Sequence, residues 1–383
     1  MDYKLSELFD LQMGKTPSRD NPAYWDSPQY AWISIADLTS AGKYITDTKE
    51  SLSALAVEES GIKVIPARTV VMSFKLSIGK VAITPEPMYS NEAIMAFVDK
   101  GIVKIDPEYL FYLLLHRDWE ERTNKAVMGK TLNKATLSNV MISIHPYEEQ
   151  REIVLVLNRV STIIEEYKLQ LRTLNQLIKA RFVEMFGEPH RSKKYPYLKV
   201  LELTDVVSGG TPDRKNADYW NEGTIPWVKT TELQNNVITV VEERITEKGL
   251  SESSAKIVPV NTVLIAMYGQ GKTRGMTGFL GIEACTNQAC ACLLPTNNID
   301  MQYLWYFLIL SYEELRGLAQ GGNQPNLNAG MIKNFPILIP PMEKQKKFVS
   351  FVSQVDKSKL SIQASLDQLE TLKQSLMEKY FGD

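Results

Sequence analysis

A long run of residues with heptad spacing, from Pro146 to Gly187, constrains the fold more than any other feature. Its apolar side chains recur in alternating steps of four and three residues, at Ile153, Leu157, Val160, Ile164, Tyr167, Leu171, Leu174 and Ile178. This 3.5-residue period predicts a helix with one apolar seam that pairs with another helix. Proline suits the first turn of a helix, and glycine suits its end. Roughly forty residues form a rod of about 60 Å, which is longer than a globular core requires.

A second run, from Pro341 to Gly382, repeats the first at a constant distance of 195 residues. Its apolar positions keep the same phase, at Phe348, Val352, Val355, Ile362, Leu366, Leu369 and Leu376. Lys359 and Lys373 interrupt this second seam where the first run has isoleucine. Because a lysine stem can lie along an apolar surface with its ammonium group in water, the lysines weaken the seam without abolishing it. We therefore expect the second run to be the partner of the first.

The segments outside the two runs repeat each other as well. Trp32 returns as Trp227, and Leu132 returns as Leu327, again 195 residues later. Strand-like β-branched and aromatic runs are separated by glycine and proline, and a helix is predicted at residues 107–119. The sequence thus predicts two mainly-β α+β domains, each followed by a long helix. The expected boundaries are 1–145 for the first domain, 146–190 for its helix, 191–340 for the second domain and 341–383 for its helix.

Some loops of the two domains have diverged while the scaffold has not. The segments 75–88 and 269–280 do not resemble each other, although the sequence on either side repeats. A duplication that preserves the scaffold and varies exposed loops suggests two related sites that recognise different things. This comparison of the chain with itself favours a binding protein.

Composition agrees with a protein that stays in the cytoplasm. No run of 18 or more apolar residues occurs, and the first ten residues lack the basic and apolar regions of a signal peptide. The formal net charge is −2, which speaks mildly against nucleic acid because duplex binders usually carry a basic face. The objection is not decisive, since a neutral subunit can concentrate its lysines and arginines on one edge.

The three cysteines, Cys285, Cys290 and Cys292, lie within eight residues of a strand-like segment. A zinc site there would need a fourth ligand, and all three histidines are remote in the sequence. We therefore expect reduced, packed thiols and no metal.

Two short motifs suggest catalysis, but each lacks a residue that its chemistry requires. Gly269 to Thr273 resembles the end of a phosphate-binding loop, but the position of that loop's first glycine is Ala266. The sequence from Asn21 to Tyr24 resembles a methyltransferase motif, but its repeat loses the proline and no S-adenosylmethionine motif appears. Tyr24 and Trp25, and their repeats Tyr219 and Trp220, are expected to be buried aromatic anchors. No catalytic residues are predicted, and the chain is expected to be a non-catalytic binder without a cofactor of its own.

Three segments in this order carry a resemblance to a known family. They are GTPDRKNADYW from Gly210, MYGQGKTRG from Met267 and ILIPP from Ile337. The chain resembles the specificity subunit of type I restriction–modification enzymes over its whole length. The first half departs from the pattern at two places. Gly14-Lys15 stands before Thr-Pro where the family has two glycines, and His145 stands where the family has the first proline of Ile-Pro-Pro.

The resemblance implies an arrangement and a set of partners. Each domain would be a target recognition domain that reads one half of a split sequence in double-stranded DNA. The two long helices would pair antiparallel, fix the unread spacer and dock two modification (methyltransferase) subunits that use S-adenosylmethionine. Restriction subunits would join indirectly through these, and no membrane would be involved. The chain itself would bind no cofactor.

Base reading is expected from the diverged polar loops. Arginine and lysine suit guanine, and asparagine and glutamine suit adenine. The candidates in the first domain are Lys75, Ser77, Lys80, Lys130 and Lys134. The candidates in the second domain are Tyr268, Gln270, Lys272, Thr273, Arg274, Asn323 and Asn326. Arg19 and Arg214, which repeat at 195 residues, are expected to be scaffold. The alternative hypothesis is a cytoplasmic coiled-coil scaffold or adaptor that never contacts DNA, which the near-neutral charge favours slightly.

Overall fold

The structure is a computed structural model with two compact units. It describes residues 1–25, 29–75, 77–119, 132–269, 271–319 and 326–382. Unit 1 consists of Met1–Lys168 together with Ala364–Asp383, and unit 2 is Leu169–Gln363. Each long helix therefore contributes to both units.

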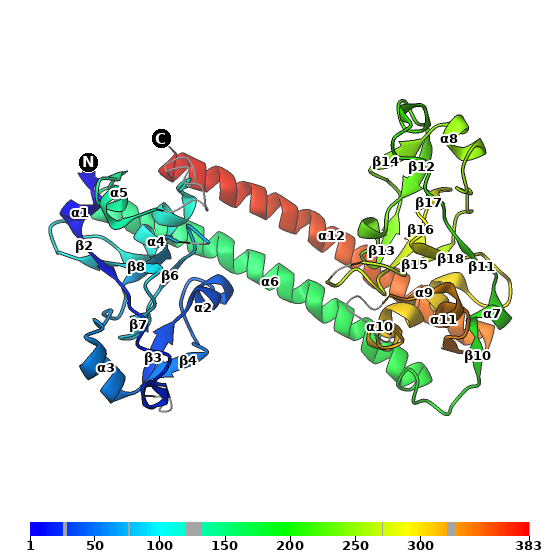
Figure 1. Cartoon of the computed structure of the whole chain (residues 1–383), viewed down its shortest axis with the longest axis horizontal. Coiled ribbons are helices and arrows are strands. Elements are labelled where there is room, and N and C mark those ends of the chain that lie inside the picture. Colours follow the sequence, from blue (N-terminus) through cyan, green and yellow to red (C-terminus); the bar gives the residue numbers. More distant parts are fainter. Residues whose placement is uncertain (26–28, 76, 120–131, 270, 320–325, 383) are drawn as a thin grey trace. The chain divides into compact units, whose positions relative to one another are not determined.

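The two predicted long helices are α6 (Tyr147–Phe186) and α12 (Met342–Phe381), each 40 residues long. In unit 1 the start of α6 packs against the end of α12 (Figure 1), where Leu157 and Met377 share one core. In unit 2 the end of α6 packs against the start of α12, where the rings of Phe182 and Phe348 lie 5.5 Å apart. Within each unit the two helices are antiparallel, and the fold class predicted from the sequence is confirmed.

The globular part of unit 1 is a mixed set of short strands and helices. Its elements in order are β1 (Asp2–Lys4), α1 (Leu5–Leu8), β2 (Phe9–Met13), η1 (Pro22–Tyr24), β3 (Tyr30–Ile33), α2 (Ile35–Ser40), β4 (Glu50–Leu52), α3 (Ala54–Ser60), β5 (Val70–Ser73), β6 (Val81–Ile83), β7 (Tyr89–Ser90), β8 (Ile94–Asp99), α4 (Pro107–His116), α5 (Lys134–Ser138) and β9 (Met141–Ser143). They form a four-stranded sheet β2-β8-β5-β6, a three-stranded sheet β4-β3-β7 and the antiparallel pair β1-β9.

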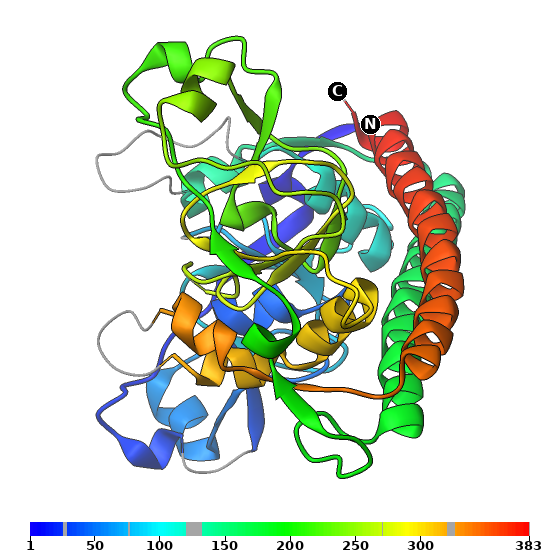
Figure 2. The same cartoon turned by 90° about the vertical axis from the view of Figure 1, so that its right-hand side faces the viewer.

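Unit 2 repeats this order, and Figure 2 turns it toward the viewer with its strands in green and yellow. Its elements are β10 (Tyr197–Lys199), α7 (Val200–Leu203), β11 (Val206–Ser208), η2 (Ala217–Tyr219), β12 (Ile225–Val228), η3 (Thr230–Glu232), β13 (Asn236–Ile238), β14 (Glu243–Ile245), α8 (Glu247–Ser251), β15 (Val263–Ala266), β16 (Thr277–Leu280), β17 (Cys285–Thr286), β18 (Cys290–Leu293), α9 (Met301–Leu310), α10 (Tyr312–Gly317), α11 (Ala329–Lys333) and β19 (Pro336–Leu338). The sheets are β11-β18-β15-β16-β13, β14-β12-β17 and β10-β19. Strand β13 has only a single-bridge counterpart in unit 1, between Tyr44 and Ile83.

A buried glutamine fixes the start of each long helix to its domain. In unit 1 the Gln150 side chain accepts a hydrogen bond from the main-chain N–H of Asp106 at 2.9 Å and donates to the carbonyl of His145 at 2.9 Å. In unit 2 Gln345 accepts from the N–H of Asp300 at 2.9 Å and donates to the carbonyl of Pro340 at 2.8 Å. Because a buried amide must be paired on both sides, each glutamine holds its helix in one position on the domain.

The long helices differ from the sequence prediction in detail. Phe182 and Phe186, which follow the predicted seam of α6, are fully buried. Leu360 and Leu372, which flank the two lysines of α12, are exposed and do not replace the missing isoleucines. Within the described residues, no helix is long and apolar enough to cross a membrane.

Candidate nucleic-acid interface

In unit 2 the candidate residues gather on the loop between β15 and β16. Tyr268 is 43% exposed at the start of this loop, and Lys272 is exposed at its tip. Helix α10 supports the loop from below, because the hydroxyl of Tyr312 donates to the main-chain carbonyl of Lys272 at 2.6 Å. Arg316 on the same helix donates to the carbonyl of Arg274 at 3.1 Å. The loop is therefore held by its backbone, which leaves the Lys272 ammonium group at the surface.

The segment before α11 lies against the same loop. The main-chain N–H of Leu327 donates to the carbonyl of Met267 at 3.0 Å, which places exposed Asn326 beside the loop that carries Tyr268. Thr273 and Arg274 are half-buried within the loop. The candidates Gln270 and Asn323 lie outside the described residues.

Unit 1 builds the equivalent region from the β5–β6 connection. The hydroxyl of Ser73 donates to the carbonyl of Ser77, which tightens the turn, and it accepts from the N–H of Lys80 at 3.0 Å. The side chains of Ser77 and Lys80 are exposed, whereas Lys75 is half-buried with its ammonium nitrogen 5.2 Å from the ring centroid of Phe74.

The segment before α5 again closes on this loop. Leu132 donates its main-chain N–H to the carbonyl of Phe74 at 3.2 Å, and Lys134 is exposed at the start of α5. The candidate Lys130 lies outside the described residues. In both units the structure therefore brings together a hairpin loop and a helix start that are about 60 positions apart in the sequence.

A third segment at this edge was not predicted from the sequence. Thr16 donates its hydroxyl to the Glu92 carboxylate in unit 1, and Thr211 donates to the Gln288 side chain in unit 2. The hydrogen bond from Thr16 lowers the pKa of Glu92, and Lys75 adds to this effect. The repeated Thr-Pro pairs are the sequence signal that could have located these residues.

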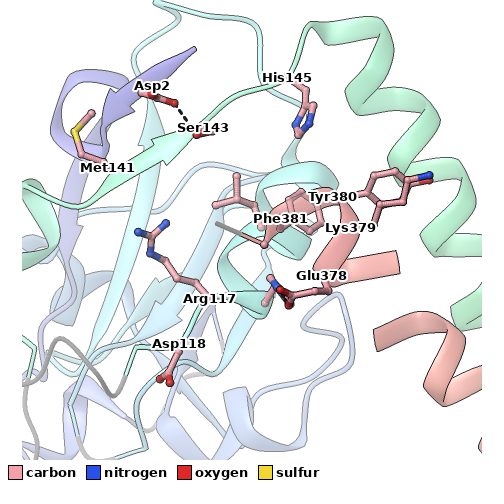
Figure 3. A pocket seen from close by; sticks show the side chains of 13 residues that line it. Asp2, Arg117, Asp118, Met141, Ser143, His145, Glu378, Lys379, Tyr380 and Phe381 are labelled. Atoms are coloured by element: carbon pink, nitrogen blue, oxygen red, sulfur yellow. Dashed lines mark hydrogen bonds and ion pairs between the residues drawn. The ribbon is translucent and has the colours of Figure 1, made fainter. Parts of the chain in front are cut away.

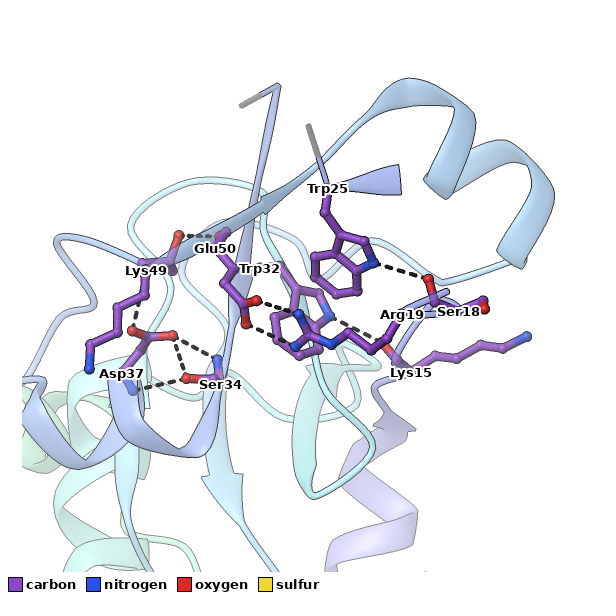
Figure 4. A network of polar contacts seen from close by, with 10 residues as sticks. Lys15, Ser18, Arg19, Trp25, Trp32, Ser34, Asp37, Lys49 and Glu50 are labelled. Carbon is purple, nitrogen blue, oxygen red and sulfur yellow. Dashed lines mark hydrogen bonds and ion pairs between the residues drawn. The ribbon is translucent and has the colours of Figure 1, made fainter. Parts of the chain in front are cut away.

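The two repeated arginines each form an ion pair and stack on a tryptophan of their own domain. The guanidinium group of Arg19 forms an ion pair with Glu50 and lies 3.9 Å from the ring centroid of Trp25 (Figure 4). The ring nitrogen of Trp32 donates to the carbonyl of Lys15 at 3.1 Å. The hydrogen bond from Arg19 lowers the pKa of Glu50. The Arg19 side chain thus connects Glu50 on β4 to the rings of Trp25 and Trp32.

Unit 2 contains the same arrangement with its own residues. Arg214 forms an ion pair with Glu243 and lies 3.8 Å from the ring centroid of Trp220. Tyr24, Trp25, Tyr219 and Trp220 are all half-buried, so the prediction that they are buried anchors is wrong. An arginine side chain, not an apolar core, covers one face of each ring.

The three cysteines lie on the strands β17 and β18 and are fully buried. Burial raises the pKa of Cys285 and that of Cys292 to about 11, and the hydroxyl of Thr286 lies 3.3 Å from the Cys292 sulfur. Thiols with such pKa values stay protonated near neutral pH, in keeping with a packing role. Within the described ranges, no group of three or more histidine, cysteine, aspartate or glutamate residues could hold a metal ion.

Lysine, asparagine and tyrosine side chains on these loops offer donors for phosphates and base edges. Comparison with known proteins agrees with this chemistry. The sequence matches the family described as the type I restriction modification DNA specificity domain, over residues 1–173 and 195–371.

Curated relatives that match this chain over most of their length are described as specificity subunits of type I restriction enzymes. The chain is 24% identical to the type I restriction enzyme MjaIX specificity subunit of Methanocaldococcus jannaschii, covering 99% of this chain and 92% of that protein. It is 21% identical to the EcoprrI specificity subunit of Escherichia coli, covering 98% and 88%.

Solved structures share the fold. The S subunit of a type I restriction–modification system from M. genitalium superposes with a TM-score of 0.58 at 14% identity, covering 100% of this chain and 96% of that one. A chain from a structural study of type I restriction–modification complex assembly gives a TM-score of 0.60 at 19% identity, covering 100% and 97%. Because the family match covers both halves, the chain belongs to the type I restriction–modification DNA specificity family, as the sequence motifs predicted.

Proposed function

We propose that the chain reads a bipartite sequence in double-stranded DNA, with each globular domain reading one half. The observation that carries this proposal is the paired loop arrangement. Both units present a hairpin loop and a helix start at the same place in the fold, but the side chains differ between units. Two copies of one scaffold with different loop side chains suit two different half-sites.

The long helices are proposed to set the spacer between the half-sites. Two modules that bind the same face of a duplex must be about one helical turn apart, roughly 34–36 Å. A helix that rises 1.5 Å per residue is a stiff element of defined length. The same helices are proposed to dock two modification subunits, through which restriction subunits join, and the chain is proposed to act in the cytoplasm.

The decisive experiment selects bound duplexes from a random pool with the chain reconstituted with its modification subunits. We expect a split consensus with two defined halves and a fixed spacer. A one-turn insertion of about four residues within residues 168–176 of α6, matched in α12 near residue 364, should lengthen the spacer and leave both halves unchanged. Altered half-sites in the insertion variant would refute the spacer role.

A single lysine tests the loop. Lys272→Ala should weaken binding and flatten the dependence of log affinity on log salt by about 1 if Lys272 contacts a phosphate. Lys256→Ala, which removes an exposed lysine elsewhere in unit 2, is the matched control. Equal affinity and slope in the two variants would remove Lys272 from the interface.

The alternative function, a coiled-coil adaptor without DNA binding, makes a different prediction. An adaptor would bind the modification subunits but would retain no duplex from the random pool when assembled with them. Retention of one consensus sequence would exclude the adaptor.

A further inference from the structure

A pocket of about 960 Å³ opens in unit 1 beside the end of α12. Figure 3 shows its walls: Asp2 on β1 and Ser143 on β9, Arg117 after α4, and Phe381 in the last turn of α12. The hydroxyl of Ser143 donates to the Asp2 carboxylate at 2.6 Å, which closes one side.

The internal repeat gives each wall residue a counterpart in unit 2. Three counterparts matter for the argument: Asp2 corresponds to Tyr197, Leu113 to Phe307 and Arg117 to Ser311. The strand pairs that carry the walls keep the same register, since Asp2 pairs with Ser143 and Tyr197 pairs with Leu338. The same place in the fold can therefore be compared in the two units.

In unit 2 this place is filled by the segment that links α6 to β10, residues 187–196. The His190 side chain lies within it, and its Nε2 is 2.8 Å from the hydroxyl of Ser311. The imidazole ring lies 5.2 Å from the ring centroid of Phe307 and 6.4 Å from that of Tyr197. His190 is half-buried, and this burial lowers the pKa of its ring. The ring also lies 5.1 Å from the ring centroid of Phe335. Three of these four neighbours are the counterparts of residues that line the pocket.

Two further contacts hold the segment 187–196 against unit 2. Tyr195 packs on Phe186, with ring centroids 6.3 Å apart, and Phe186 is the counterpart of Phe381 in the pocket wall. The hydroxyl of Ser192 donates to the carbonyl of Phe186 at the end of α6. The segment therefore covers the end of α6 as well as the sheet.

The walls of the pocket in unit 1 differ in side chains and in charge from those of the filled place in unit 2. At two wall positions, Leu113 and Asp2 of unit 1 replace Phe307 and Tyr197 of unit 2. At three others the change is the reverse, since His116, His145 and Tyr380 replace Leu310, Pro340 and Met185. Three carboxylates line the pocket, those of Asp2, Asp118 and Glu378, against the two cations Arg117 and Lys379 and the two histidines His116 and His145. The Nε2 of His116 lies 3.2 Å from the Glu378 carboxylate, so the acidic excess is a single charge while the histidines are neutral. The linking segment of unit 2 is basic, with the sequence EPHRSKKY from Glu188.

We propose that the pocket of unit 1 binds an extended, basic segment of a partner protein, which inserts one ring side chain as His190 does in unit 2. The tethered segment of unit 2 shows what this fold accepts at that place. The acidic excess of the walls complements a segment with basic residues on either side of the ring. The proposal is independent of DNA reading, so its failure would leave the proposed function standing.

The test uses the full chain and a synthetic peptide of residues 187–195, GEPHRSKKY. In unit 2 the segment benefits from an effective concentration in the millimolar range because both its ends are tethered. Binding in trans is therefore weak and is best measured by saturation-transfer NMR on the peptide. We expect saturable binding, with the imidazole protons receiving the strongest transfer. The same peptide with alanine for histidine should bind at least fivefold more weakly.

Two exposed methionines provide the variant and its control. Met141→Arg places a positive charge at the rim of the pocket, where Met141 is 44% exposed, and should weaken peptide binding at least tenfold. Met13→Arg makes the same change at a 48% exposed residue away from the pocket and should leave binding unchanged. Because both methionines are exposed and neither belongs to the buried core, neither change disturbs a core.

Three results would overturn the proposal. Absence of saturable binding would do so, and so would equal binding by a scrambled peptide of the same composition. The third is self-association of the chain, measured by sedimentation and competed by the peptide, which would make the occupant a second copy rather than a partner protein.

Discussion

Units 1 and 2 share a scaffold but join the long helices through different side chains. In unit 2 the end of α6 lies among rings, with Phe182 packed on Phe186, Phe307 and Phe348. In unit 1 the counterpart of Phe182 is Met377, which packs beside Leu157. The contrast teaches that the duplication preserved where the helices attach, through the glutamines, while the apolar filling was free to change.

The largest change in stability is expected from a substitution that removes a ring from the aromatic packing of unit 2. Phe182→Ala should lower the free energy of unfolding by about 4 kcal/mol, whereas Met377→Ala in unit 1 should cost about 2–3 kcal/mol. Urea unfolding measures both values, and hydrogen exchange assigns each loss to its unit. The controls are the exposed pair Leu177→Ala and Leu372→Ala, which should change stability by less than about 0.5 kcal/mol. Equal losses at Phe182 and Met377 would mean that the two fillings are equivalent.

The glutamines test the shared part of the comparison. Gln150→Leu and Gln345→Leu each leave buried main-chain groups unpaired, and each should cost about 2–3 kcal/mol. Gln354→Leu, at an exposed position of α12, is the control. A loss in one unit only, measured by urea unfolding, would contradict the idea of a common attachment.

A single lysine marks the weakest point of the second helix. Burial lowers the pKa of Lys373, and Lys168 and Lys43 lower it further. Lys373→Ile, which restores the residue found at Ile178, should raise the stability of unit 1 by about 1 kcal/mol at neutral pH. The matched change Lys379→Ile, at an exposed position, should not.

The pH dependence of the same variant gives a second readout. Because the pKa of Lys373 is lower when folded, the unfolded chain binds more protons between that pKa and the ordinary value near 10.4. The wild-type chain should therefore gain stability as the pH rises through this window, relative to Lys373→Ile. Parallel stability curves for the two proteins would rule out a charged, half-buried Lys373.

The smallest effect concerns the arginine–tryptophan clusters. Arg19→Lys and Arg214→Lys lose the stacked guanidinium plane, and each should cost about 0.5–1 kcal/mol. The ordinary pKa of a glutamate is near 4.3, and the hydrogen bond from Arg19 lowers the folded pKa of Glu50. The ion pair of Arg19 and Glu50 therefore contributes its full stabilisation above the ordinary glutamate pKa. This stabilisation is lost as the pH falls through the lowered pKa of Glu50 in the folded chain. Glu50→Gln should remove this acid sensitivity from unit 1, as followed by urea unfolding between pH 3 and 6.

The sequence predicted the elements that follow from a periodic pattern. It did not predict which side chains are buried where burial depends on packing between distant segments. The heptad spacing located α6 and α12, because an apolar period of 3.5 is a property of the chain alone. The burial of Phe182 and Phe186 depends on α9 and was not visible in that period. Likewise, Trp25 was predicted to be buried because nothing in the sequence shows that Arg19 covers its ring.

The candidate interface was predicted in part. The divergence between the two repeats located the loops that carry Lys75 and Lys272, because the comparison needs only one chain. The closing contact from Leu132 or Leu327 and the threonine contacts to Glu92 and Gln288 arise between distant segments, so no local pattern predicted them. Which of these side chains touch bases stays a prediction.

The division of the long helices between the units has a consequence for biosynthesis. Unit 2 is one continuous stretch, Leu169–Gln363, so all of its residues emerge from the ribosome together. Unit 1 lacks Ala364–Asp383 until after unit 2 has emerged, and Met377 belongs to its core. Because domains fold as their residues become available, the second half of this chain can reach its native packing before the first. Loss of residues 364–383 would then damage the domain that was synthesised earliest.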